Sequence, residues 1–250
     1  MTKEQQIARM LRKQEAPPAS IERAVLIRTD LADQYTTVPG PLGVLHVGFT
    51  SLGISSIVPT IDEDEFLTAH AARVGRVAYP GELPPRLAGQ LRRAIESGRP
   101  AKLPVDLRVV TPFQQRVLEV TATIPPGEVR PYGWVAREMA NEGAVRAVGT
   151  ALARNPVPIA IPCHRVVKSD GGLGNYAFGA AMKRSLLEHE GMTEFGKLRY
   201  VGSDTTNIFC FPTCRHARRI GSSHRVEFAT PTLAIAAGFR ACRLCRPGPG

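Results

Sequence analysis

The sequence predicts an α+β protein in several parts, and three observations support that fold class. Short apolar runs of strand length are followed by helix-like segments up to about residue 108. From Thr111 onward the apolar residues recur at helical spacing, with turns between the segments. Four of the five cysteines lie in the last fifth of the chain, which indicates a separate small unit. The predicted parts are an N-terminal extension (residues 1–23), an α/β domain (24–108), a helical domain (109–195) and a cysteine-rich module (196–250).

The first two parts are predicted to hold a polar helix and then a small sheet. The helix ends at Ala16-Pro17-Pro18, because two adjacent prolines form a natural boundary. The hairpin turn of the sheet is expected at Thr50-Ser51-Leu52. Residues 86–95 have helical periodicity, and the acidic run 62–65 is interpreted as a solvated loop or a helix N-terminus. Strands are expected over residues 24–27, 43–49 and 53–58, where His46 is interpreted as a structural histidine.

Three short helices are predicted in the next part. Their apolar faces fall within residues 113–120, 134–139 and 145–152. The segment Ile124-Pro125-Pro126-Gly127 ends the first helix, and Asn141-Glu142-Gly143 forms a turn before the third. A short helix, a glycine turn and another short helix form the outline of a helix-turn-helix motif. By itself this outline is weak evidence for DNA binding, because many helical hairpins bind nothing.

Charge and cysteine usage narrow the partner and the compartment. A net charge of +10 over 250 residues favours a polyanionic partner, nucleic acid before anionic membrane, with a merely cationic soluble surface as the alternative. No apolar run approaches the roughly 18 residues of a membrane helix, and the N-terminus lacks the apolar core of a signal peptide. We therefore expect a cytoplasmic protein whose cysteines are nucleophiles or metal ligands rather than disulfides.

The pentapeptide Pro162-Cys163-His164-Arg165-Val166 carries the main chemical signal. Cys163 is the only cysteine outside the last fifth of the chain, and a histidine follows it directly. A free thiol titrates near about 8.5 and only the thiolate attacks, so a nucleophilic cysteine needs a base. Glu190, in a downstream helical run, is a candidate to orient that base. A lone Cys-His pair is a weak signal, and its neighbours give it weight.

The stretch from Phe113 to Gly191 resembles the catalytic domain of the O6-alkylguanine-DNA alkyltransferases. The matching motifs occur in the family's order and spacing: FQ-x-x-V, IP-x-G, RAVG, NPVP, PCHRV, G-x-Y-x-x-G and LL-x-x-EG. The resemblance extends weakly over the preceding α/β domain. It implies an RNase H-like cap domain, a winged helix-turn-helix-like catalytic domain, and single-turnover transfer of an alkyl group from O6-alkylguanine in double-stranded DNA to a cysteine.

The resemblance also implies roles for individual residues. Cys163 would be the nucleophile, and His164 would take its proton through a bound water molecule. Glu190 would hold the imidazole in the useful tautomer, as the third member of other triads does. Asn155 would fix the local turn within this network. Tyr132 would donate a proton toward the guanine and assist its extrusion.

The same resemblance implies base flipping, since the alkyl carbon cannot be reached inside a stacked duplex. Arg146 would fill the vacated stack from the minor groove. The substrate pocket would include Tyr176, Ala177 and Phe178. Ala177 stands where some members carry serine, and Phe178 where some carry glycine. A bulky Phe178 is expected to narrow the pocket and to disfavour large alkyl groups.

The cysteine-rich module is predicted to bind zinc. Its cysteines have C-x3-C and C-x2-C spacings, which suit a tetrahedral Zn²⁺ site, and the unit is too small for a substantial core without metal. The segment resembles the zinc-binding module of the Ada methylation-response proteins. That resemblance makes Cys210 a second methyl acceptor, from methylphosphotriesters, and Arg215, Arg218 and Arg219 phosphate ligands. A purely structural role for Cys210 stays open. The four predicted metal ligands are Cys210, Cys214, Cys242 and Cys245.

Two alternatives stay open beside DNA repair by alkyl transfer. A Cys-His peptidase or acyltransferase usually places its cysteine and histidine far apart in the sequence. A non-enzymatic alkylation-damage sensor would use the helix-turn-helix and a structural zinc module, with Cys163 not turning over. We expect double-stranded DNA carrying alkylated guanine as the partner, no membrane, no obligate protein partner, and a location at the nucleoid.

Overall fold

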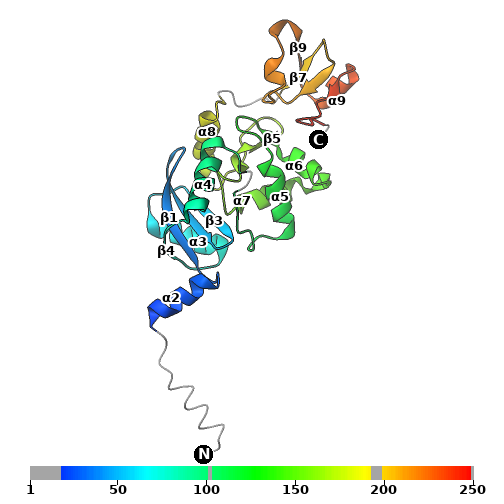
Figure 1. The fold of residues 1–250 in the computed structure, drawn as a ribbon. Helices are drawn as coiled ribbons and strands as arrows, with labels where there is room; N and C mark the ends of the chain where they lie inside the picture. The colour runs from blue at the N-terminus through cyan, green and yellow to red at the C-terminus, as the bar shows by residue number, and fades with distance from the viewer. Residues whose placement is uncertain (1–17, 101–102, 193–198, 249–250) are drawn as a thin grey trace, which may run out of the picture.

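The computed structural model describes residues 18–100, 103–192 and 199–248. In Figure 1 three regions follow one another from the N-terminal sheet, through a helical middle region, to a small sheet near the C-terminus. Buried apolar side chains of all three regions belong to one contiguous core. Among the described residues, no helix combines the length and apolar character that crossing a membrane requires. The polar helix predicted for the first residues lies outside the described residues.

The N-terminal region is a four-stranded sheet in the order β3-β2-β1-β4 with helices around it. β1, β2 and β3 pair antiparallel, and β4 pairs parallel to β1. The β2–β3 hairpin confirms the predicted turn after Thr50. The elements are α2 (Ala19–Arg28), β1 (Asp33–Gly40), β2 (Gly43–Thr50), β3 (Gly53–Val58), α3 (Glu63–Val74), β4 (Ala78–Pro80) and α4 (Pro85–Ser97).

The strand predicted over residues 24–27 is wrong, because this segment lies inside helix α2. Four apolar residues are too few to separate a strand from a helix by periodicity. The flanking residues Glu22 and Arg28 favour the helix, since they place charge of the right sign in its first and last turns. None of the residues of α2 is buried. The boundary expected between residues 23 and 24 therefore falls within one continuous helix.

Two other expectations for this region are confirmed. The acidic run begins α3, where the Asp62 side chain caps the helix by accepting a hydrogen bond from the Glu65 N–H at 2.8 Å. His46 is buried, and its Nδ1 lies 2.8 Å from the carbonyl oxygen of Thr60. It is a satisfied structural histidine, as its apolar strand predicted.

The middle region contains the three predicted helices. The first begins with a capping box between Thr111 and Gln114, which fixes its start. A short parallel pair, β5 with β6, lies beside the helices. The elements are α5 (Pro112–Ala122), β5 (Arg130–Pro131), α6 (Tyr132–Glu138), η1 (Glu142–Ala144), α7 (Val145–Ala153), η2 (Cys163–Arg165), β6 (Val166–Val167) and α8 (Gly179–His189).

The C-terminal region is a second four-stranded sheet, in the order β10-β8-β7-β9. β7 pairs antiparallel with β8 and β9, and β10 pairs parallel to β8. Its elements are β7 (Tyr200–Ser203), β8 (Ile208–Cys210), η3 (Ala217–Arg219), η4 (Ser222–His224), β9 (Arg225–Phe228), α9 (Pro231–Ala236) and β10 (Arg240–Ala241). Cys210 is the last residue of β8, and Cys242 directly follows β10, so the parallel pairing of these two strands brings the cysteine pairs together.

Candidate functional site

Cys163 is held by the turn that follows α7. Asn155 organises this turn, because its Oδ1 accepts a hydrogen bond from the Val157 N–H at 3.0 Å and its Nδ2 donates to the carbonyl of Ile161 at 2.9 Å. The same Nδ2 lies 3.2 Å from Cys163 Sγ. Asn155 and Cys163 are both buried. The side chain expected to fix the turn therefore also contacts the sulfur.

His164 and Glu190 form the expected pair behind the cysteine. His164 Nε2 lies 3.0 Å from Glu190 Oε1. Three hydrogen bonds from Arg165 hold the same carboxylate, at 2.7 to 3.1 Å. Arg165 is fully buried, and it also donates to the carbonyls of Ile124 at 2.6 Å and Gly98 at 2.7 Å. Glu190 is thus fixed between an imidazole and a guanidinium.

The shifted pKa values indicate that Cys163 and His164 are both uncharged in the resting protein. Burial raises the pKa of the Cys163 thiol, although the hydrogen bond from Asn155 and the charge of Lys183 oppose this shift. Burial lowers the pKa of His164, against the opposing effect of Glu190. Burial alone would raise the pKa of Glu190, but hydrogen bonds from His164 and Arg165 lower it to about 2. At neutral pH the site holds a thiol, a neutral imidazole and a carboxylate.

The hydrogen bonds of His164 decide which of its two ring nitrogens can accept a proton. Nε2 is bound to Glu190, and Nδ1 is buried without a hydrogen-bond partner among the described residues. A neutral imidazole that donates from Nε2 has a lone pair at Nδ1, so Nδ1 is the atom that can accept a proton. The pairing with Glu190 fixes this tautomer. Nδ1 of His164 is therefore the candidate proton acceptor for the neighbouring Cys163 thiol.

A cavity of about 600 Å³ opens beside Cys163. Five residues singled out from the sequence line it: Tyr132, Arg146, Cys163, Tyr176 and Ala177. The Tyr132 hydroxyl donates to the carbonyl of Asn175 at 3.4 Å, and burial raises its pKa, so it stays a proton donor at neutral pH. Helices α6 and α7 supply one wall and the segment 174–177 supplies another.

Phe178 does not lie on the wall of this cavity, contrary to the expectation. Its ring packs under the guanidinium of Arg73, with 4.6 Å between the Arg73 Cζ and the ring centroid. It also meets the ring of Tyr176 edge-on, with 5.7 Å between centroids. Phe178 therefore supports Tyr176 from behind instead of narrowing the cavity. The sequence could not place it because Arg73 comes from α3, about a hundred positions earlier.

Sequence reasoning missed Lys183 and the role of Arg165. Lys183 is fully buried on α8, and its Nζ donates to the carbonyl of Val166 at 2.6 Å and to that of Asn175 at 3.4 Å. Burial lowers its pKa to about 8, against the effect of the Cys163 charge. A signal existed for Arg165, because it follows His164 within the PCHRV motif. Lys183 gave none, since a lysine on an amphipathic helix is ordinarily solvated.

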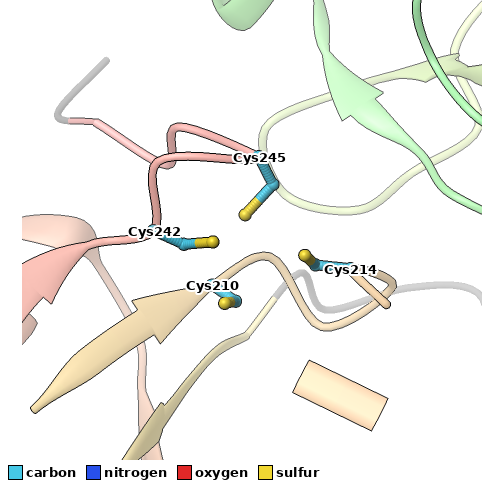
Figure 2. A group of neighbouring side chains, drawn as sticks. All are labelled: Cys210, Cys214, Cys242 and Cys245. Carbon is cyan, nitrogen blue, oxygen red and sulfur yellow. The ribbon is translucent and has the colours of Figure 1, made fainter. Parts of the chain in front are cut away.

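The four predicted metal ligands come together in the C-terminal region. Their sulfur atoms all lie within 4.8 Å of one another, and all four residues are buried. Figure 2 shows the four side chains pointing toward a common centre, two from each cysteine pair. In a tetrahedral site with Zn–S bonds of about 2.3 Å, the sulfurs lie about 3.8 Å apart. The donor set and its spacing fit a Zn²⁺ ion bound by four thiolates.

The three arginines predicted to contact phosphate, Arg215, Arg218 and Arg219, are all exposed, as a phosphate ligand requires. Arg218 also directs its Nη2 to the carbonyl oxygen of Gly127 in the middle region. Sequence reasoning missed this internal contact, and the phosphate role of Arg218 stays a prediction. A long side chain beside a zinc ligand could not be assigned to DNA or to protein from the sequence.

The Glu190 carboxylate gives a testable pH dependence. Its pKa falls from 4.5 in the unfolded chain to about 2 in the folded protein, so the stability it contributes is present above pH 4.5 and is lost as the pH falls toward 2. Glu190→Gln leaves the buried Arg165 without its anion and should cost about 3 kcal/mol at pH 7. Urea unfolding at several pH values measures this difference.

The control for this prediction is Glu188→Gln, which changes an exposed carboxylate on the same helix. It should shift the free energy of unfolding by less than about 0.5 kcal/mol. The gap between wild type and Glu190→Gln should shrink below pH 4.5. A gap that stays constant from pH 7 to pH 3 would contradict the assigned ion pair.

Two family models match the chain. One, described as "6-O-methylguanine DNA methyltransferase, DNA binding domain", matches residues 112–192. The other, described as "Metal binding domain of Ada", matches residues 192–248. The two matches meet at residue 192, close to the boundary predicted between the helical domain and the cysteine-rich module. They account for the Cys163 site and for the four-cysteine cluster separately.

Curated relatives carry the name methylated-DNA–protein-cysteine methyltransferase. The relative from Methanothermobacter thermautotrophicus is 36% identical over 143 residues, covering 54% of this chain and 79% of that protein. One from Mycobacterium bovis is 50% identical over 86 residues, covering 34% of this chain and 52% of that protein. One from Shigella flexneri is 47% identical over 81 residues, which cover 47% of it. The chain spans about half the length of the relatives from Mycobacterium bovis and Shigella flexneri.

Solved structures give the same comparison for the fold. The Mycobacterium tuberculosis OGT in complex with DNA has a TM-score of 0.51 and 34% sequence identity, covering 63% of this chain and 92% of that chain. The O6-methylguanine-DNA methyltransferase of Pyrococcus kodakaraensis has a TM-score of 0.52 and 27% identity, covering 64% and 99%. Nearly all of each solved chain is therefore matched, with about a third of this chain left over.

Proposed function

The chain belongs to the methylated-DNA–protein-cysteine methyltransferase family, and from this premise we propose that it repairs DNA by moving an alkyl group from O6-alkylguanine to Cys163. The observation that carries the proposal is the position of Cys163. Its sulfur lies at a cavity of about 600 Å³, and His164 behind it keeps a free Nδ1. Transfer of a labelled methyl group from duplex DNA to the protein is the direct test.

The proposed reaction is a single displacement. Cys163 loses its proton to His164 Nδ1 through a water molecule, while Glu190 stabilises the imidazolium from Nε2. The sulfur forms a bond to the alkyl carbon as the bond from that carbon to guanine O6 breaks. The departing guanine takes a proton from Tyr132, whose raised pKa keeps it protonated. The product is a thioether, so each chain reacts once.

The proposed DNA contacts come from the helix pair beside the cavity. Helices α6 and α7, joined by η1, form the helix-turn-helix, and β5 with β6 supplies the wing of the proposed winged fold. Arg146 lies on α7 at the rim of the cavity, so it is in place to occupy the stack that a flipped guanine leaves. The same helix carries the exposed Ala147 and the half-buried Gly149, two small residues that would let it approach the minor groove closely. Ala151, the third small residue of the helix, is buried in the core.

The domain assignment follows the same family. We assign the region up to residue 108 to an RNase H-like cap domain, supported by three antiparallel strands, a helix, and a fourth strand parallel to the first. Because helix α2 (Ala19–Arg28) spans the boundary predicted between residues 23 and 24, the whole of α2 is assigned to this domain. Residues 109–195 form the proposed catalytic domain and 196–250 the zinc module. Its proposed partner is double-stranded DNA carrying alkylated guanine, and its proposed place of action is the cytoplasm, at the nucleoid.

Methylphosphotriester repair by the zinc module is a second proposed activity. Cys210 ends strand β8, and zinc would keep its thiolate charged at neutral pH. Methylation would convert that thiolate into a neutral thioether. The exposed Arg215, Arg218 and Arg219 are the proposed phosphate ligands. The alternative of a non-enzymatic damage sensor is not favoured, because a sensor needs neither a nucleophile nor a base. It would not explain the Asn155–Cys163 contact or the pairing of His164 with Glu190.

Base flipping by Arg146 can be tested apart from chemistry. Arg146→Ala should slow alkylation of Cys163 from O6-methylguanine duplex by about tenfold or more, because flipping costs a few kcal/mol. Alkylation by the free base O6-benzylguanine should change by less than about twofold, since no duplex is opened. Single-turnover kinetics with both substrates measure the ratio.

Arg93→Ala is the matched control, because Arg93 is exposed on α4, outside the proposed DNA-binding part of the chain. It should leave both rates unchanged apart from a small general effect of charge. If Arg146→Ala slows both substrates equally, the substitution has damaged the fold or the cavity. In that case Arg146 does not act in extrusion.

A further inference from the structure

The zinc module and the middle region share a hydrogen-bonded interface. Trp134 on α6 is buried, and its Nε1 donates to the carbonyl oxygen of Cys245 at 3.0 Å. The buried Arg130 guanidinium lies over the Phe211 ring of the module, with 5.1 Å from Cζ to the centroid, and 5.6 Å from the Trp134 ring. Arg246 pairs with Glu138 at 2.6 Å. Both cysteine-bearing turns of the module thus contact the middle region.

Three consecutive residues of the middle region are bound by the module. We call residues 124–129, between α5 and β5, the bracing loop. The Val129 N–H donates to Thr213 Oγ1 at 3.1 Å, and Glu128 Oε1 accepts from the Arg215 N–H at 3.1 Å. Arg218 Nη2 donates to the Gly127 carbonyl. All three partners lie within four residues of the zinc ligand Cys214.

The bracing loop also holds the carboxylate behind Cys163. The Gly127 N–H donates to Glu190 Oε2 at 3.1 Å, while Glu190 Oε1 faces His164. Gly127 has a φ of +68°, and a Cβ there would lie 2.8 Å from the Glu190 carbonyl oxygen. The loop is therefore packed against the end of α8. A displacement of Gly127 would change the position of the Glu190 carboxylate relative to the His164 imidazole.

The conformation of the module's turn depends on its metal ligands. The Arg218 N–H donates to the Cys214 carbonyl at 3.2 Å, and the Cys214 N–H to the Phe211 carbonyl at 3.0 Å. The Cys214 sulfur belongs to the four-thiolate cluster. A unit of this size draws much of its folding free energy from the metal. Metal occupancy accordingly decides whether Thr213, Arg215 and Arg218 are presented to the bracing loop.

We propose that the zinc-loaded module is a positioning element for the alkyl-transfer site, and that Arg218 is its positioning residue. This inference rests on the proposed transfer to Cys163. The path runs from the Cys214 turn through Arg218 to Gly127, and from there through Glu190 to His164. Two sites that the two family models describe separately are thereby joined in one chain.

The expected effect is moderate. When the Arg218–Gly127 hydrogen bond is lost, Glu190 keeps its hydrogen bonds to Arg165 and His164. The position of Glu190 should therefore become less well fixed, while the ion pair stays intact. The loss of one such hydrogen bond corresponds to about fivefold in rate, or roughly 1 kcal/mol. The affinity for a free base should stay the same, because the cavity residues do not take part in the interface.

The first experiment compares full-length zinc-loaded variants in single-turnover alkylation by the free base O6-benzylguanine. This probe removes any contribution of Arg218 to phosphate binding. Arg218→Ala should lower the rate constant about fivefold without changing the dissociation constant. Arg218→Lys should restore much of the rate, since an ammonium can also donate to the Gly127 carbonyl. Arg225→Ala, which removes an exposed arginine of the module on strand β9, should leave the rate within about twofold.

The second experiment removes the metal with a chelator and follows Trp134, the only tryptophan of the chain. Its emission should shift to longer wavelength as the Cys245 contact is lost, and alkylation should slow by at least the Arg218→Ala factor. Zinc removal from the Arg218→Ala variant should lower the alkylation rate by less than the product of the two separate rate losses, because both changes act through one contact.

Three results would overturn the inference. They are an unchanged Trp134 emission after zinc removal, an unchanged free-base rate after zinc removal, or an Arg218→Ala effect seen only with duplex DNA. The last would make Arg218 a phosphate ligand. Failure of the proposed function would look different, because wild-type protein with zinc would then not be alkylated at Cys163 at all.

Discussion

Cys163→Ala is expected to abolish methyl transfer from O6-methylguanine duplex, with a loss of several orders of magnitude. The sulfur of Cys163 is the atom that forms the new bond in the proposed reaction, and Cys163 is the one cysteine among the described residues that line the cavity. Affinity for DNA should survive, because contacts to phosphate supply most of it. Intact-protein mass spectrometry after incubation with the duplex should show one added methyl group on wild type and none on the variant.

The control uses the second proposed acceptor. On DNA bearing methylphosphotriesters, Cys163→Ala should still gain one methyl group at Cys210, and peptide mass spectrometry identifies the site. Cys210→Ser should show the converse pattern. Transfer from O6-methylguanine at the wild-type rate in Cys163→Ala would refute the central assignment. Labelling of Cys163 alone on phosphotriester DNA would leave Cys210 as a structural ligand.

Removal of the metal is expected to unfold the C-terminal region. Zinc contributes about 10 kcal/mol or more of apparent binding free energy in small four-ligand domains, and this region has four buried thiols at its centre. Cys214→Ala, or a chelator, should therefore abolish hydrogen-exchange protection over residues 200–248. Residues 112–192 should keep most of theirs, because their core is apolar. Exchange followed by mass spectrometry resolves the two regions.

Cys163→Ala is the matched cysteine substitution for this experiment. It should keep one zinc per chain, measured by metal analysis, and full protection of the C-terminal region. A C-terminal region that stays protected after metal removal would contradict the prediction. The four-stranded sheet and its buried side chains would then suffice for folding without zinc.

The catalytic and metal sites could be predicted from the sequence because their parts are close in the chain or have a characteristic spacing. Asn155, Cys163 and His164 lie within ten positions, so the turn that joins them is local. The C-x3-C and C-x2-C spacings of the cysteine pairs are visible in the sequence and indicate a zinc site. The helices of the middle region were found because each has an apolar face at helical spacing and a clear start or end.

The rest depends on contacts between distant segments. β1 escaped prediction because it mixes polar and apolar residues and is stabilised by its pairing with β2 and β4. Phe178 was misplaced because its partner, Arg73, comes from α3. The contact of Arg218 with the Gly127 carbonyl could not be predicted, because nothing near Arg218 in the sequence indicates that acceptor. In each case the deciding neighbour lies far along the chain.

The burial of Cys163 protects its thiol from side reactions before a substrate binds. Its thiol is 5% exposed and its pKa is raised by burial, so at rest it is protonated. Oxidants and adventitious alkylating agents attack thiolates at accessible positions far faster than buried thiols. A protein that reacts once cannot recover from a wasted reaction. Keeping the sulfur neutral until a substrate fills the cavity lengthens the working lifetime of each molecule in the cell.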